Sequence, residues 1–237
     1  SGGGMSNLNF LSDYASIKNG SYGKLMKAYY TKDANKGVSS AEKNNKKDTS
    51  TAKDSAKTLS SIEEAADKLK DSADALSKTG SKSVFNKVDV EKTDENGVTT
   101  TTKEYDVNAI YKSVNEFVNN YNDVIKKAGE SATTSVQNRA KFMTTATEAN
   151  KRMLEKVGVT INKDKTLSLD EKTFKEADMN TVKSLFNGSM SYANRISSQA
   201  SMVESAAKNE ASKANTYDWK GNYNNSYNTG SIYDYGF

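Results

Sequence analysis

Two stretches of the chain place apolar residues at alternating intervals of three and four positions, with polar residues between them. This spacing is typical of helices that pack along a narrow, coiled-coil-type seam. It predicts one helix near residues 53–79 and a second near 106–128, for which Asp106 is a suitable N-cap. The seam positions are Leu59, Ile62, Ala66, Leu69, Ala73 and Leu76 in the first helix, and Val107, Ile110, Val114, Phe117, Tyr121 and Val124 in the second.

A third helix is predicted near residues 134–157 by residues that recur at every seventh position. These residues are Val136, Met143, Asn150 and Val157, with Ala140 and Met153 at the alternate sites. A polar residue at a seam position costs stability, but it can fix the register or the number of partners. We therefore expect Asn150 to face the seam.

The last long helix is predicted near residues 180–215, and its seam consists mostly of methyl-sized groups. Small groups gain little on burial, at about 25 cal/mol per Å² of apolar area. We therefore expect residues 201–215 to fray in the isolated chain and to become ordered against another subunit. The alternative is that the helix folds back on Leu59–Leu76 or Val107–Val124 within one chain. The candidate partner contacts on this helix are Ile196, Ala200, Val203, Ala207 and Ala214.

Two β-hairpins are predicted between these helices. Residues 84–105 alternate β-branched and polar side chains around Asn96–Gly97, and Asn-Gly between such runs is a strong hairpin signal. Residues 158–169 contain the short alternating pieces GVTI and TLSL, joined across Asn162–Lys165. A helix start follows, either as a capping box over residues 168–171 or with Asp170 as the N-cap.

The two ends of the chain differ from its helical middle. Residues 5–50 suggest short helices followed by a polar linker, and residues 51–216 form the predicted bundle. Residues 217–237 are rich in Tyr, Asn and Gly without a period, which predicts a disordered tail. Its aromatic residues, among them Trp219 and Tyr223, could stack on glycans or pack into a neighbouring subunit.

The composition favours narrow helical seams over one large core. Hydrophobic residues make up 35% of the 237-residue chain, and the mean hydropathy is −0.81. The chain has no proline, whereas average usage would give about a dozen. Because proline breaks helix interiors, its absence suits a mostly helical chain. The expected fold is mainly α: an elongated helical bundle or coiled-coil-like stalk with one or two small β-hairpins.

The residue types present exclude several kinds of chemistry. The sequence contains neither Cys nor His, which removes thiolate nucleophiles, imidazole bases, disulfides and the commonest transition-metal ligands. A calcium loop starting at Asn162 fails, since Leu167 and Thr173 stand where Gly and Glu are required. Acidic residues could pair for glycoside chemistry, but no cleft-forming scaffold is indicated. We expect no enzymatic activity, no cofactor and no metal.

The charge pattern argues against two further classes of partner. The chain has 34 Lys and Arg against 30 Asp and Glu, and the two signs are interleaved along the predicted helices. Interleaved charges indicate solvated helix faces rather than a nucleic-acid-binding stripe. No apolar run approaches the roughly 20 residues of a membrane span, so no membrane insertion is expected. No secretory signal peptide is visible, which leaves a cytoplasmic protein, export by another route, or a signal that has been removed.

One part of the sequence resembles a known family. The segment VNEFVNNYNDVIKKAGES (Val114–Ser131) resembles the FV..YN.L helix of the flagellar filament-capping protein, the hook-associated protein 2 family. In that family a second helix follows, and then a stretch of the form lGi....dGtLsLDe.kl..Al......v..lF. Here Val157–Gly188 reads VGVTINKDKTLSLDEKTFKEADMNTVKSLFNG in the same order. The family usually has Gly where Lys165 stands, and a longer spacer near Asp178.

The resemblance spans about residues 105–188, with the final helix matching by position, and it implies a helical leg domain braced by the small hairpin. It also implies a scaffolding role, in which the chain associates with itself or docks on flagellar subunits. Family members leave the cell through the flagellar export channel, so the resemblance implies an extracellular location on the flagellum. The alternative is a secreted, adhesin-like binding module whose aromatic tail contacts glycans or host surfaces.

Overall fold

The structure, a computed structural model, describes residues 51–213, 215–217 and 223–225. Within them lie seven helices and three antiparallel two-stranded pairs, so the fold is mainly α. The helices are α3 (Ala56–Ser77), α4 (Val107–Glu130), α5 (Thr134–Ala149), α6 (Lys151–Lys156), α7 (Glu171–Glu176), α8 (Met179–Phe186) and α9 (Tyr192–Ser212). The paired strands are β1 (Lys87–Thr93) with β2 (Thr99–Tyr105), β3 (Val159–Ile161) with β4 (Leu167–Leu169), and β5 (Asn215–Tyr217) with β6 (Tyr223–Asn225).

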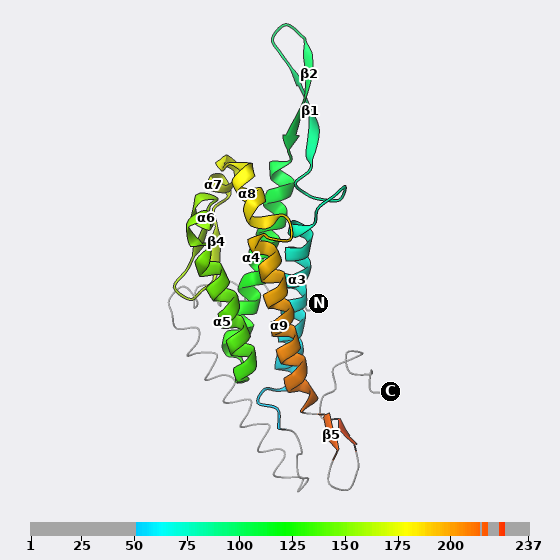
Figure 1. Ribbon diagram of the computed structural model, residues 1–237, viewed down its shortest axis with the longest axis vertical. Coiled ribbons are helices and arrows are strands. Elements are labelled where there is room, and N and C mark those ends of the chain that lie inside the picture. The colour runs from blue at the N-terminus through cyan, green and yellow to red at the C-terminus, as the bar shows by residue number, and fades with distance from the viewer. Residues whose placement is uncertain (1–50, 214, 218–222, 226–237) are drawn as a thin grey trace, which may run out of the picture.

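The four long helices α3, α4, α5 and α9 lie side by side along the long axis of the molecule (Figure 1). Helix α9 packs against both α3 and α5, and α4 packs against α3. The two predicted seams are confirmed as core positions, since every member except Val107 is buried. Val107 is partly buried against the same core. Alternating spacing therefore identified the buried faces of α3 and α4 correctly.

Short polar side chains begin several of these helices by accepting hydrogen bonds from free backbone N–H groups. The Ser55 hydroxyl accepts from Thr58 N at 3.1 Å, and Asp106 accepts from Ala109 N at 3.1 Å, as its sequence position predicts. At α7 the N-cap is Asp170, whose carboxylate accepts from Thr173 N at 2.7 Å. Of the two starts left open by the sequence, the structure therefore has the one at Asp170.

The predicted helix over residues 134–157 is wrong in one respect, because it is divided into α5 and α6. Asn150 lies in the break, where its side-chain amide donates to Ala146 O at 2.9 Å. It is therefore a helix-terminating residue and not a seam residue. After the break, Leu154 is fully buried whereas Met153 is 36% exposed, so the alternate site expected at Met153 belongs to Leu154.

The predicted helix over residues 180–215 is also two helices. Helix α8 ends at Phe186, and α9 begins at Tyr192 with Ser191 as its N-cap. Asn187 follows α8 and donates through its amide to Leu76 O and Lys78 O, both at 2.9 Å. The connection therefore satisfies carbonyl groups at the end of α3, which a continuous helix would leave without this partner.

The small β3–β4 hairpin falls within the predicted range and is fixed to α4 by one side chain. The Asn122 amide donates to Leu167 O at 2.8 Å and accepts from Leu167 N at 2.7 Å. Lys165, in the turn, has a φ of 72°, which is left-handed backbone that favours glycine. Gly158 has a φ of 85° and approaches the start of α7 so closely that a Cβ atom would lie 3.0 Å from Asp170 O.

At the opposite end of the bundle, the start of α3 and the end of α9 are fastened together. Thr51 N–H donates to Lys213 O at 3.4 Å, and Lys53 N–H donates to the Glu210 carboxylate at 2.7 Å. The Asp54 carboxylate also accepts from three groups of the turn between α4 and α5. These are Ser131 Oγ at 2.6 Å, Ala132 N at 2.8 Å and Thr133 Oγ1 at 2.5 Å.

Near its two ends the chain is described only from residue 51, and after residue 213 only over residues 215–217 and 223–225. The expected short helices and linker over residues 5–50 lie outside the described residues, as do Ala214, Trp219 and most of the tail. The expectation of a disordered tail differs from the structure at one place, where β5 pairs with β6 through Asn215↔Asn225 and Tyr217↔Tyr223.

Candidate interaction surface

The β1–β2 hairpin extends beyond the end of the four-helix bundle (Figure 1). Its two strands pair in a continuous register from Lys87↔Tyr105 to Thr93↔Thr99. In the turn, the Asp94 carboxylate accepts from Asn96 N and Val98 N, both at 2.9 Å, while Gly97 supplies a φ of 78°. The Asn-Gly signal therefore predicted the hairpin correctly, and the pairing follows from the turn.

Most side chains of the hairpin are exposed on both faces of the ribbon. In β1 only Val90 is partly buried, and in β2 only Glu104 and Tyr105 are. Val88 and Val98 are 43% and 58% exposed. A two-stranded hairpin has little independent stability in water, so this ribbon contributes little to folding. Its exposed side chains and strand edges are available to a partner.

The two edges of the hairpin carry different chemistry. Four of the seven residues of β1 are charged: Lys87, Asp89, Glu91 and Lys92. Strand β2 begins with four uncharged threonines, Thr99–Thr102, and its charges, Lys103 and Glu104, lie near the bundle. The Lys103–Asp89 and Lys92–Glu104 ion pairs, at 3.0 and 2.8 Å, are both exposed. Such exposed pairs contribute about 0–1 kcal/mol each, so they help to orient the two strands but add little to the stability of the hairpin.

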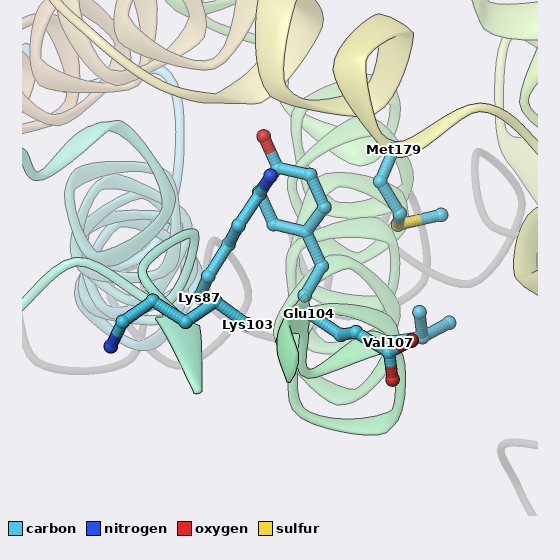
Figure 2. Close-up of a pocket in the computed structure, with 6 residues that line it drawn as sticks. Lys87, Lys103, Glu104, Val107 and Met179 are labelled. Carbon is cyan, nitrogen blue, oxygen red and sulfur yellow. The ribbon is translucent and has the colours of Figure 1, made fainter. Parts of the chain in front are cut away.

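The base of the hairpin is anchored against the bundle. The Tyr105 hydroxyl donates to Asn180 Oδ1 at 3.1 Å, and the Lys87 ammonium lies 5.0 Å from the Tyr105 ring centroid. Beside this anchor is an open hollow of about 350 Å³ between the hairpin and the starts of α4 and α8 (Figure 2). It is lined by Lys87, Lys103, Glu104, Tyr105, Val107 and Met179. The hollow marks the junction of the hairpin and the bundle.

The candidate contacts predicted on the last helix lie inside the bundle. Ile196, Ala200, Val203 and Ala207 have no exposed surface. They belong to the face of α9 that packs against α3 and α5, so they cannot contact a partner while the helix stays packed. Helix α9 continues to Ser212 with Ala211 buried, as in the alternative in which it folds back on the chain's own helices.

Of the remaining candidates, only one lies among the described residues. Tyr223 is the first residue of β6, and Ala214 and Trp219 are outside the described residues. An exposed group on α5 and α9 was not predicted from the sequence. Phe142 is 55% exposed, with the Arg139 guanidinium 5.9 Å from its ring centroid and 3.5 Å from Met202 sulfur. Phe142 does not follow the spacing of the buried residues of α5, and this could have been recognised in the sequence.

A buried hydroxyl cluster joins α4, α5 and α9 in the centre of the bundle. Thr147 Oγ1 donates to Met143 O at 3.1 Å, accepts from Tyr121 at 2.8 Å and lies 2.7 Å from the Tyr192 hydroxyl. Burial raises the pKa of both tyrosines above the usual range, so both remain protonated donors. The Thr147 lone pairs can therefore accept from both phenols. This cluster satisfies its own polar atoms and has a structural role.

In the part of the chain that the structure describes, no group of three or more His, Cys, Asp or Glu side chains is placed to hold a metal ion. Among the described helices, none is long and apolar enough to cross a membrane.

Comparison with known proteins gives no family assignment: no family model, no curated protein and no solved structure matches this chain.

Proposed function

We propose that this chain is a non-enzymatic structural component of the bacterial flagellum, similar to the filament-capping protein. It works by associating with itself or by docking on flagellar subunits, and it reaches the cell exterior through the flagellar export channel. In this proposal the four long helices act as an elongated, coiled-coil-like stalk. The hairpin and the two chain ends are then the parts that make contacts with partners.

The observation that carries the proposal is the order of elements in the region that resembles the capping family. A long helix is followed by a second helix, a tight hairpin, an acidic helix cap and a further short helix, over α4 to α8. Lys165, where the family usually has Gly, has a φ of 72°. A backbone that favours glycine at this turn is what the family pattern requires. This agreement supports the resemblance at a position that composition and periodicity do not address.

Immunogold electron microscopy of the native cell tests the proposal directly. Antibodies raised against the chain should label flagella, most densely at one site such as the filament tip, and pre-absorption with the purified protein should abolish the label. Label spread over the cell body and absent from flagella would refute a flagellar role.

A second measurement separates the proposal from the adhesin-like alternative. Glycan-array binding by the full chain should be no stronger than binding by a variant without residues 217–237. Binding that is strong and lost with this segment would favour the adhesin-like module instead.

A further inference from the structure

We propose that the outer edge of β2, which pairs with no other strand among the described residues, pairs with β2 of a second copy in an antiparallel arrangement centred on Thr101. This inference rests on the proposed function, because it names the surface through which the scaffold associates with itself. The result would be a four-stranded ribbon in the order β1–β2–β2–β1, with the two helical bundles at opposite ends.

The two edges of the hairpin differ in how well they are protected against pairing with another strand. The outer edge of a sheet presents unpaired N–H and C=O groups, and natural proteins commonly protect such edges with charged residues. Strand β1 is protected in this way by charge at four of its seven positions. Strand β2 offers Thr99–Thr102 instead, a run of uncharged, β-branched residues that favour extended pairing. The β2 edge is therefore the one open to another strand.

The hydrogen-bond pattern of the hairpin determines which backbone groups of β2 point away from β1. Asp94 N–H donates to Val98 O, so the Asp94–Val98 pair directs its backbone groups inward. Hydrogen-bonded and non-hydrogen-bonded pairs alternate along an antiparallel ladder. Counting three pairs from the turn, the Glu91–Thr101 pair directs its N–H and C=O groups outward. Thr101 can therefore exchange two backbone hydrogen bonds with Thr101 of a second copy.

The register of the proposed pair follows from the exposure and charge of β2. The exposed part of β2 is Thr99–Lys103, because Glu104 and Tyr105 are partly covered at the bundle. The midpoint of this exposed part is Thr101. An antiparallel pair centred there places Thr99 opposite Lys103 of the second copy and opposes no like charges. Centring the pair on Lys103 would bring two ammonium groups together and is disfavoured.

Antiparallel pairing is also compatible with the shape of the molecule, because it keeps the two helical bundles apart. Strand β2 runs from the distal turn toward the bundle, so reversing the second copy moves its bundle to the far end of the ribbon (Figure 1). One pair of short strands buries less than the roughly 1,200 Å² of a stable interface, so the contact is weak in isolation. It gains strength where many copies are held together, as in an assembled scaffold.

Single cysteines test the register, because the full sequence contains no cysteine. In the proposed pair, the two Thr101 Cα atoms would be about 5.5 Å apart, within the range that a disulfide can bridge. The full-length Thr101→Cys variant at about 0.1 mM under mild oxidation should therefore form a cross-linked dimer. The matched control is Glu91→Cys, which lies directly across the hairpin on the same face but on the charged edge. We expect at least about tenfold less cross-linking from the control, since its sulfurs meet only by collision.

A proline variant tests the backbone bonds independently. Thr101→Pro removes the outward N–H of β2 and should abolish concentration-dependent dimerisation in sedimentation velocity, whereas Glu91→Pro should leave it within about twofold of the wild type. Equal cross-linking from both cysteine variants, no cross-linking from either, or an unchanged dimer in Thr101→Pro would overturn the inference. If the protein still associates but Thr101→Cys does not cross-link, only the assignment of association to the β2 edge is wrong. Failure of the flagellar role would instead appear as immunogold label away from flagella.

Discussion

Helix α9 and the β1–β2 hairpin contain similar numbers of residues. The helix is packed into the bundle, whereas the hairpin projects from it (Figure 1). The seam of α9 is made mostly of alanines, which contribute little apolar area, and all of its described members are fully buried. The hairpin carries β-branched side chains that remain exposed. Small residues let α9 lie close to α3 and α5. Whether a segment is buried therefore depends more on the elements that pack against it than on the size of its own apolar side chains.

The largest effect on stability is expected from a charge placed in the α9 seam. Ala207→Asp introduces a carboxylate where the native side chain has no exposed surface. Because an uncompensated buried charge is strongly destabilising, we expect a loss of about 3–5 kcal/mol in the free energy of unfolding. Urea denaturation measures it. The control is Ser205→Asp on the exposed side of α9, which should change stability by less than about 0.5 kcal/mol.

Equal and small losses from both variants would show that the end of α9 is not packed in solution. In that case the fraying of residues 201–215, with ordering on assembly, would be the better description.

Removal of the buried hydroxyl that joins three helices should have the next largest effect. Thr147→Val keeps the shape of the side chain but removes the acceptor shared by Tyr121 and Tyr192. Leaving buried phenol hydroxyls unsatisfied costs about 1–3 kcal/mol. Thermal melting should show this loss, while Thr145→Val, on the exposed side of α5, should melt close to the wild type. Similar melting of the two variants would mean that water replaces the lost hydroxyl.

The contact between α3 and α9 should also depend on pH. Burial alone would raise the pKa of Asp74, but hydrogen bonds from Ser197 and Lys70 outweigh it and hold the pKa below its ordinary value. A carboxyl with a lowered folded pKa stabilises the fold above its unfolded pKa of 3.8, and this stability is lost as pH falls through the folded value.

We therefore expect the free energy of unfolding to decrease below about pH 3.8, with a contribution from Asp74 of about 1 kcal/mol or less, since the side chain is partly exposed. Asp74→Asn should be less stable than the wild type at pH 7, and the difference should shrink toward pH 2. A difference that stays constant over this range would assign the effect to packing instead.

The smallest effect is expected in the hairpin. Lys103→Ala removes an ion pair with Asp89 whose side chains are 72% and 63% exposed, so we expect it to contribute about 0.5 kcal/mol or less, the lower half of the range for exposed pairs. The melting temperature of the bundle should therefore be unchanged within error. As a comparison on the bundle surface, Lys127→Ala removes a less exposed pair with Asp123 and should have a slightly larger effect. A large destabilisation by Lys103→Ala would show that the hairpin supports the core.

The sequence predicted what short-range rules determine. Alternating spacing identified the seams of α3 and α4, and Asn96–Gly97 identified the hairpin turn, because each signal lies within the element that it specifies. The break after Phe186 was missed for a different reason. Only the three-dimensional structure explains the break. There Asn187 donates hydrogen bonds to carbonyl groups at the end of α3, more than a hundred residues away in the sequence.

The candidate site was predicted less well than the fold. A seam pattern shows which face of α9 is apolar, but it does not show whether the cover comes from the same chain or from another one. Ala200 and Ala207 are compatible with cover from the same chain or from another one. In the structure the chain's own helices cover them. The unequal edges of the hairpin became readable only once the register had paired each residue of β1 with one of β2.

The fastening of Thr51 to Lys213 has a consequence for the engineering of this protein. The two backbone positions are in hydrogen-bond contact, so a short linker could join them at little entropic cost. The exposed turn at Asn96–Gly97, at the far end, is then a natural place to open the chain. A circular permutant of residues 51–213 would keep every bundle contact and would separate β1 and β2 onto different chain ends. Each strand could then be offered to a partner without the other.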